Sequence, residues 1–158
     1  FLAFGPLLTL GVGFAVFDGN FLETSAEGIN HFMHCLLLGI PLGLLTTNIL
    51  LINEFPDMKG DSTTGKNHLV VTFGKKTRRW IYFMFLALAV ASSFYMYKEI
   101  GNVYLLIPTI FCLFFGLYIF KHILKHYELR TLVDSNWKTI GLQALYSIIL
   151  CICLIFGF

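Results

Sequence analysis

Three acidic residues stand close together near the middle of the chain, at Glu54, Asp57 and Asp61. Their spacing of three and then four residues places them on one face of a helix, with about 5–6 Å between neighbouring side chains. Like charges at that distance repel one another. The pattern therefore predicts that a cation binds beside them.

Magnesium is the cation that suits this cluster, because it prefers oxygen ligands, keeps several waters and is usually held by one or two carboxylates together with substrate phosphates. Asp57 and Asp61 each offer a carboxylate oxygen without closing a cage, which leaves room for a phosphorylated ligand. Asn53, one turn before Asp57, adds a neutral oxygen to the predicted metal site. Lys59 and Lys66 are expected to contact phosphate as point charges.

A second interpretation of the same residues stays open when only their spacing is considered. Asp57 would then cap a helical turn in an ordinary loop, and the nearby lysines would only set the membrane topology. Pairs of aspartates four residues apart are common, so the choice between the two interpretations needs further features of the chain.

The segments around this cluster are long and hydrophobic. Of the 158 residues, 57% are hydrophobic and 13% are charged, whereas about a quarter of an average soluble domain is charged. Asp, Glu, Lys and Arg are absent from residues 1–17, 31–53, 80–97, 103–120 and 139–157. Each stretch is close to the roughly 20 residues that cross about 30 Å of hydrocarbon as a helix. The composition excludes a water-soluble domain and predicts an all-α, polytopic transmembrane bundle with five spanning helices.

The basic residues are distributed unevenly among the segments between these predicted spans. Ten of the eleven Lys and Arg residues lie in segments 54–79 and 121–138, whereas segments 18–30 and 98–102 contain only Lys98. Alternate loops emerge on the same side of a membrane, so the positive-inside rule places segment 54–79 in the cytoplasm. We expect a multi-pass integral membrane protein. Its formal charge of +2 is too small to indicate nucleic-acid binding.

Small and polar residues mark the second predicted span. Gly39 and Gly43 form a small-xxx-small pair, which predicts close contact with another helix. Thr46, Thr47 and Asn48 lie deep in the same span, where polar groups either bond across helices or line a cavity. Both of these roles stay open.

Two histidines, His122 and His126, are four residues apart and share a helix face, as paired metal ligands often do. No third ligand is evident near them. We interpret them as interfacial cations on a basic helix end.

Segment 53–74 resembles the second aspartate-rich motif of the UbiA-type membrane prenyltransferase superfamily, reading Asn53-Glu54-xx-Asp57-xxx-Asp61-xxx-Gly65-Lys66-xx-Leu69-Val70-Val71-xx-Gly74. Within that superfamily the chain is most similar to the 1,4-dihydroxy-2-naphthoate polyprenyltransferases of menaquinone synthesis. Two shorter runs also resemble that branch: Phe4-Gly5-Pro6-Leu7 and Pro41-x-Gly43-Leu44-Leu45.

The resemblance implies a magnesium-dependent enzyme that transfers a polyprenyl group from prenyl diphosphate to an aromatic acceptor, in menaquinone or related quinone biosynthesis. It implies that Asp57 and Asp61 are catalytic metal ligands. It gives Asn53 a supporting role in metal and substrate binding, and makes Lys66 a catalytic contact to the diphosphate. Membrane lipid is the expected surrounding partner.

The resemblance also implies that residues 1–158 are the C-terminal half of a single membrane prenyltransferase domain. The family has nine helices, of which the five predicted spans would be the fifth to ninth. A first motif, Asn-Asp-xx-Asp-xxx-Asp, does not occur in the 158 residues. We therefore expect the missing N-terminal half to supply it, and this segment alone to be inactive. The alternative is a non-enzymatic membrane module, such as a transporter half or an assembly subunit, with a cation-binding cytoplasmic loop.

Overall fold

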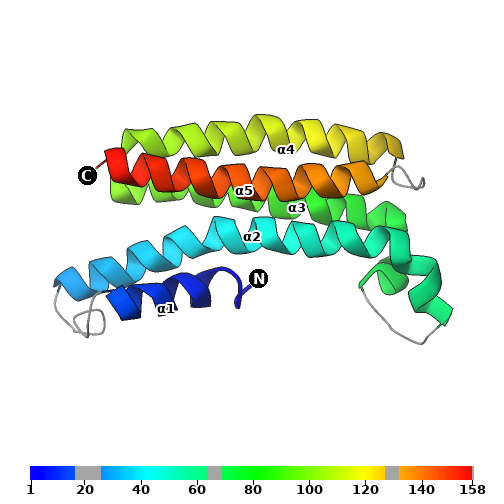
Figure 1. The fold of residues 1–158 in the computed structure, drawn as a ribbon, viewed down its shortest axis with the longest axis horizontal. Helices are drawn as coiled ribbons and strands as arrows, with labels where there is room; N and C mark the ends of the chain where they lie inside the picture. Colours follow the sequence, from blue (N-terminus) through cyan, green and yellow to red (C-terminus); the bar gives the residue numbers. More distant parts are fainter. Residues whose placement is uncertain (17–25, 64–68, 127–131, 158) are drawn as a thin grey trace.

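Four long helices and one short helix dominate the computed structural model of the chain (Figure 1). It describes residues 1–16, 26–63, 69–126 and 132–157, with the backbone alone at 26–27, 55–63 and 69–76. The elements are α1 (Pro6–Val16), α2 (Ala26–Thr63), α3 (Leu69–Ile100), the short 3-10 helix η2 (Val103–Leu105), α4 (Leu106–His126) and α5 (Val133–Phe156). The predicted all-α class is confirmed.

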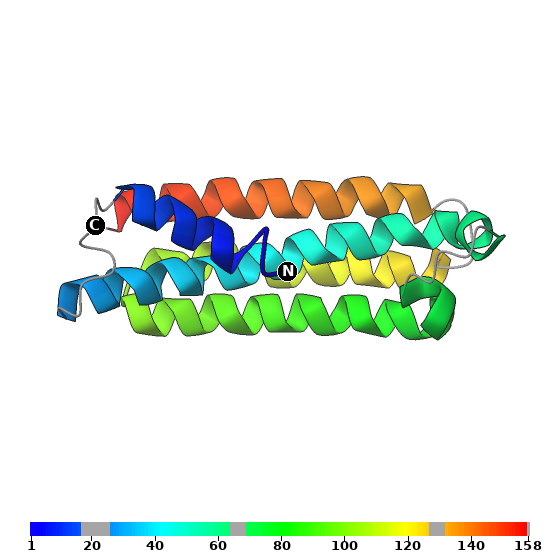
Figure 2. The ribbon, with the colours of Figure 1, turned by 90° about the horizontal axis from the view of Figure 1, so that it is seen from below.

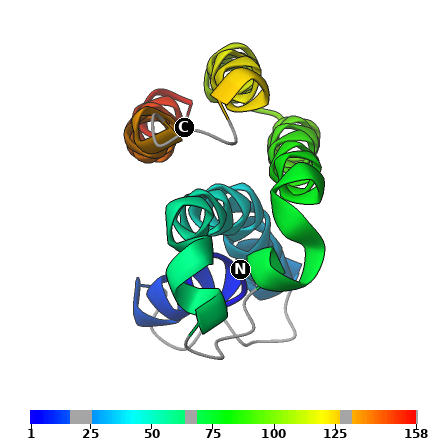
Figure 3. The ribbon, with the colours of Figure 1, turned by 90° about the vertical axis from the view of Figure 1, so that its right-hand side faces the viewer.

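Helices α2 to α5 form an antiparallel bundle in which each helix packs against two others in a ring (Figures 1 and 3). Helix α2 contacts α3 and α5, and α4 closes the ring by contacting the same two helices. Helix α1 lies outside the ring, against the N-terminal part of α2 and on the side opposite α5 (Figures 2 and 3). The four-helix ring is therefore the unit that positions the motif.

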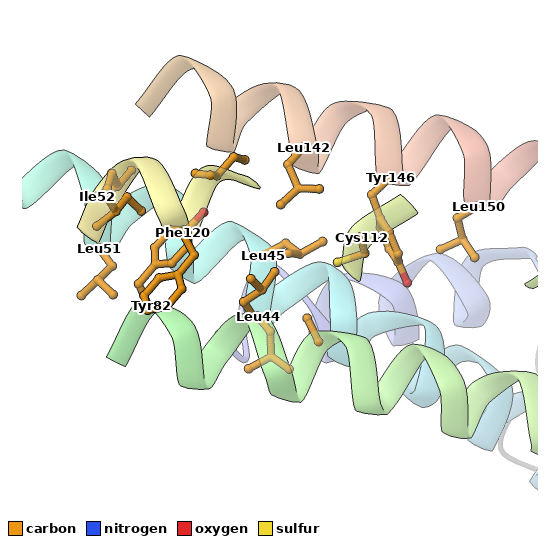
Figure 4. Packing of buried hydrophobic residues seen from close by; sticks show 14 of the residues in the cluster. Leu44, Leu45, Leu51, Ile52, Tyr82, Cys112, Phe120, Leu142, Tyr146 and Leu150 are labelled. Atoms are coloured by element: carbon orange, nitrogen blue, oxygen red, sulfur yellow. The ribbon is translucent and has the colours of Figure 1, made fainter. Parts of the chain in front are cut away.

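Side chains from all four long helices fill the centre of the ring (Figure 4). Leu45, Tyr82, Cys112, Leu142 and Tyr146 are at most 1% exposed. Burial of large apolar groups of this kind is worth about 1.5–3 kcal/mol for each side chain in water, whereas inside a bilayer close packing carries more of the stabilisation. The bundle therefore has a continuous packed interior.

Four helical segments are long and apolar enough to cross a membrane: Gly28–Glu54, Thr77–Ile100, Val103–His126 and Val133–Phe156. The shortest of them have 24 residues, which corresponds to about 36 Å at 1.5 Å per residue and exceeds the ~30 Å hydrocarbon core. Four of the predicted spans therefore have longer counterparts: two extend beyond the predicted bounds at both ends, Val103–His126 extends at its C-terminal end, and Val133–Phe156 begins six residues earlier and ends one residue earlier than predicted. The polytopic transmembrane bundle is confirmed.

The first predicted span, residues 1–17, differs from this pattern. Within its described part the helix covers only Pro6–Val16, and these 11 residues measure about 16 Å. Pro6 begins the helix because its fixed φ and missing N–H suit the first helical turn. The absence of charge thus revealed an apolar segment, but the described helix is about half as long as the hydrocarbon core is thick.

The segment predicted as a loop, residues 54–79, is mostly helical. Helix α2 continues to Thr63 and α3 begins at Leu69, so only residues 64–68 lie outside the described helices. Near its C-terminal end α2 changes direction (Figure 1). Pro56 explains a bend there, because it removes one backbone hydrogen bond from the helix interior. The acidic motif therefore lies on a helical continuation of α2 instead of on a loop.

Glycines allow α1 to approach α2 closely, as the small-xxx-small pair predicts. A Cβ built at Gly39 would lie 2.4 Å from Thr9 Oγ1 and 2.6 Å from the Cα of Pro6. One turn later, a Cβ at Gly43 would lie 3.0 Å from the Cα of Gly5. Real Cβ atoms do not approach other atoms this closely, so the contact requires glycine at Gly39.

Gly39→Ala is expected to destabilise the protein by about 1–3 kcal/mol, because the added methyl group forces α1 away from α2. Gly11→Ala is the matched control, since a Cβ there meets nothing within 4 Å. The control is expected to raise stability by up to about 1 kcal/mol through helix propensity. Thermal unfolding in detergent micelles measures both changes. Shifts of the same sign and size in the two variants would contradict the packing argument.

Candidate active site

The predicted metal-binding residues lie where α2 leaves its membrane-spanning segment. The span ends at Glu54, whereas the helix continues to Thr63. Asp57 and Asp61 are four residues apart in the part of α2 beyond Pro56, so the helical backbone places them on successive turns of one face. Asn53 stands on the turn before Pro56, in the part of α2 that packs in the bundle.

The side chains of the predicted site fall into two groups. Asn53 is described and exposed at the end of the span. The side chains of Asp57, Lys59 and Asp61, and the whole of Lys66, lie outside the described residues. Their roles in binding metal and diphosphate stay predictions, which rest on residue type and on the helical register of α2.

The chemistry of this donor set fits magnesium. Two carboxylates one helical turn apart, with an amide oxygen on the turn before, supply the hard oxygen ligands that the ion prefers. So few protein ligands leave coordination positions for water and for phosphate oxygens. Among the side chains that the structure describes, no group of three His, Cys, Asp or Glu residues is arranged to hold a metal ion. Asn53, Asp57 and Asp61 stay the predicted ligands because of their residue types and spacing.

Glu54, the first acid of the cluster, forms an ion pair with Arg78 near the start of the α3 span. Arg78 is fully buried, and its Nη1 also donates to the carbonyl oxygen of Leu51 at 3.5 Å. A buried guanidinium is costly unless it faces a negative charge and its hydrogen bonds are made. Glu54 therefore joins α2 to α3 directly beside the motif, and its carboxylate is engaged in that pair.

A chain of polar contacts continues from α3 across the same end of the bundle. The hydroxyl of Tyr82 lies 3.0 Å from Oγ1 of Thr139 on α5, which donates to the Ser135 carbonyl at 2.7 Å. The Ser135 hydroxyl lies 2.7 Å from Nδ1 of His122 on α4. Tyr82 lies in the first half of α3, His122 near the end of α4, and Ser135 and Thr139 near the start of α5. These helix ends lie at the same end of the bundle as the C-terminal end of α2 (Figure 1). This network links three helices next to the proposed site.

The two histidines have local roles in that network. Their rings stack with centroids 4.3 Å apart. His122 contacts Ser135 as described, and Nδ1 of His126 lies 3.0 Å from the His122 carbonyl oxygen. The pair therefore contributes to the contact between α4 and α5.

The polar residues deep in α2 are hydrogen-bonded inside the bundle. The hydroxyls of Thr46 and Thr47 donate to carbonyls one turn earlier, and Thr46 also accepts a hydrogen bond from Gln143 Nε2 on α5 at 3.2 Å. Asn48 is fully buried and donates to the Tyr82 carbonyl at 3.3 Å. Within the described structure its Oδ1 has no hydrogen-bond partner. The threonines thus serve packing, whereas Asn48 keeps an acceptor available inside the bundle.

Spacing alone does not reveal the partner of Glu54. In the sequence, Arg78 stands among the basic residues of a predicted loop and Glu54 among the acids of the cluster. A signal was available, because Arg78 stands two residues before the charge-free stretch 80–97. A charge at the edge of a membrane span usually has a partner. The contacts among Tyr82, Thr139 and Ser135 had no comparable signal.

The fold and the site together define a multi-pass helical membrane protein with an acidic motif at the boundary of one spanning helix. The model of the UbiA prenyltransferase family matches residues 1–132, which include the motif and helices α1 to α4. The chain therefore belongs to the UbiA prenyltransferase family. No match was found among curated proteins or among solved structures. Membership implies an enzyme that transfers prenyl groups, with prenyl diphosphate and aromatic substrates in a membrane environment.

Proposed function

We propose that this chain carries the magnesium- and diphosphate-binding half-site of an enzyme that transfers a polyprenyl group to an aromatic acceptor in menaquinone or related quinone biosynthesis. The observation that carries the proposal is the position of Asp57 and Asp61 on one face of α2, just beyond the membrane-spanning segment. A site at the membrane boundary can bind the charged diphosphate of the substrate in water while the apolar prenyl chain lies in lipid. Family membership supports the prenyl-transfer chemistry.

The chain's own residues would divide the work as follows. Asp57 and Asp61 bind the metal, and Asn53 supports it with a neutral oxygen. Lys59 and Lys66 bind phosphate oxygens as point charges. Bound magnesium supplies positive charge that stabilises the leaving pyrophosphate. The bond between the allylic carbon and the diphosphate oxygen breaks, the same carbon bonds to a ring carbon of the acceptor, and the ring loses one proton.

The bundle supports this site by fixing the direction of α2. The ion pair between Glu54 and Arg78 ties α2 to α3 one turn before Asp57. Transition-state stabilisation depends on groups that are held in place before the reaction starts. We infer that this pair positions the motif without touching the substrate.

We propose further that the active enzyme needs the first aspartate-rich motif, which would lie in an N-terminal half of the same domain. The motif in segment 53–74 supplies only half of the metal ligands that the resemblance implies. Without the other half, residues 1–158 are expected to lack prenyl-transfer activity. The five helices of the chain would then be the fifth to ninth of nine.

The proposed orientation places the motif on the cytoplasmic side. The basic residues in question are Arg78 and Arg79 at the start of the α3 span, Lys121 and Lys125 near the end of α4, and Lys138 near the start of α5. These helix ends lie at the same end of the bundle as the C-terminal end of α2 (Figure 1). Lys98 lies at the opposite end. This asymmetry supports the orientation through the positive-inside rule.

A thermal-shift series tests the ligand chemistry. The protein, prepared with the first aspartate-rich motif present, is heated with geranylgeranyl diphosphate in the presence and absence of magnesium. Ligand at 100 times its Kd is expected to add about 2.7 kcal/mol of stability, or about 5–10 °C in Tm, only when magnesium is present. A non-enzymatic membrane module predicts no magnesium-dependent shift. That result would reject the proposed function.

A further inference from the structure

A groove of about 520 Å³ runs between α3 and α4 on the outer surface of the bundle. Its floor is formed where Gly116 lets α4 approach Leu86, because a Cβ at Gly116 would lie 2.4 Å from Leu86 Cδ1. Its walls include the exposed apolar side chains of Ala87, Ala91 and Ile110. The groove therefore opens away from the bundle interior and away from the proposed active site.

The lining of the groove suits an alkyl chain. Thr109 is the one lining residue with a polar side chain, and its hydroxyl donates to the Leu105 carbonyl at 2.8 Å. A ligand with polar groups would have to leave them without partners there, which is unfavourable in an apolar environment. A saturated or isoprenoid hydrocarbon has no such groups.

The groove is long enough for an acyl chain. On α3 its lining residues extend from Phe83 to Phe94, which corresponds to about 16 Å at 1.5 Å per residue. These residues lie in the middle of the span Thr77–Ile100, so an acyl chain that enters from the Ile100 end of the span runs along the groove and past the bilayer midplane.

A positive charge stands at one end of the groove. Lys98 lies one turn beyond Phe94, and its Nζ lies 5.4 Å from the centroid of the Phe94 ring. The next residue, Glu99, interacts with the Tyr95 hydroxyl on the neighbouring face of α3. Among the described side chains no carboxylate lies within ion-pair distance of Lys98. Its ammonium group is thus placed at headgroup depth to meet an anion.

We propose that the groove between α3 and α4 binds an acyl chain of an anionic phospholipid, and that Lys98 binds the phosphate of its headgroup. The apolar walls select a hydrocarbon chain, and the charge at the groove end selects an anionic headgroup. One basic residue near a membrane surface is worth about a fivefold preference for an anionic lipid. This site is separate from prenyl transfer and does not depend on it.

A tryptophan in the groove reports the lipid that occupies it. Ile110→Trp is combined with Trp80→Phe and Trp137→Phe, which remove both native tryptophans. The protein is reconstituted in phosphatidylcholine bilayers that contain a rising fraction of brominated phosphatidylglycerol or brominated phosphatidylcholine. Brominated phosphatidylglycerol is expected to reach half-maximal quenching at a mole fraction about fivefold lower than brominated phosphatidylcholine does.

Single substitutions test the role of the Lys98 charge and the role of the groove separately. Lys98→Gln is expected to abolish the preference for phosphatidylglycerol, whereas Lys98→Arg keeps it. Ala91→Phe fills the groove and is expected to reduce the quenching by brominated phosphatidylglycerol to the level of bulk lipid. Lys125→Gln, near the other end of α4, is the matched control and is expected to leave the preference unchanged.

Four results would overturn the proposal. Equal quenching by both lipids, or a preference that survives Lys98→Gln, would show that Lys98 selects no headgroup. Protection of the tryptophan from both lipids would show that a second copy of the chain covers the groove. Displacement of brominated phosphatidylglycerol by geranylgeranyl diphosphate would assign the groove to the prenyl chain.

Discussion

Asp57→Asn is expected to lower the rate of prenyl transfer by at least about 100-fold at a fixed magnesium concentration, and Asp61→Asn to do the same. Asparagine keeps the shape of the side chain and one oxygen, but it removes the negative charge that holds the metal beside the diphosphate. Transfer of a labelled geranylgeranyl group to an aromatic acceptor measures the rate, in membranes that contain both aspartate-rich motifs. Excess magnesium is expected to restore part of the activity of each single variant.

The matched control is Asp134→Asn. Asp134 is an exposed aspartate in the first turn of α5, at the same end of the bundle as the motif. Its loss removes the same charge without touching the proposed ligands, so the transfer rate is expected to change by less than about twofold. The site assignment fails if both motif variants turn over like the wild type, or if Asp134→Asn is equally impaired.

The spanning helices were predictable because a membrane imposes a simple requirement on them. About 20 residues without charge must form a helix, since no water is present to satisfy an exposed backbone. Four of the five charge-free stretches met that requirement. The stretch at residues 1–17 shows where prediction from hydropathy fails. Hydropathy does not indicate that the described helix begins at Pro6, nor that α1 packs on α2 at Gly39.

The motif was predictable from spacing, whereas its surroundings were not. Residues four apart share a helix face wherever the backbone is helical, so the register of Asp57 and Asp61 follows from local sequence. The ion pair between Glu54 and Arg78 joins residues 24 positions apart, and it depends on how the hairpin of α2 and α3 closes. Local spacing carries no information on that closure, and so the sequence analysis grouped Glu54 with the metal-binding acids.

The role of Asn48 could be predicted from the sequence only in part. Its sequence position indicated either packing or a cavity, and the structure shows a fully buried side chain that bonds across helices. Its amide nitrogen donates to the Tyr82 carbonyl on α3, while its amide oxygen is buried without a hydrogen-bond partner among the described residues. Such an acceptor is costly in a finished core, which is why buried polar groups are nearly always bonded.

Glu54→Gln is expected to destabilise the protein by about 3 kcal/mol, because it removes a negative charge that pairs with the fully buried Arg78. The value is at the lower end for a broken buried pair, since the Glu54 side chain is 31% exposed. Unfolding in detergent measures the change. Glu99→Gln is the control, and loss of this exposed carboxylate is expected to change stability by less than about 0.5 kcal/mol.

A double variant separates the charge pair from general packing around Glu54. In Glu54→Gln with Arg78→Met the buried guanidinium is gone, so most of the lost stability is expected to return. If the pair also orients the motif, prenyl transfer by this double variant stays impaired although its stability has recovered. Recovery of both properties would show that the pair only stabilises the fold, whereas recovery of neither would show that Glu54 and Arg78 act through contacts with other groups.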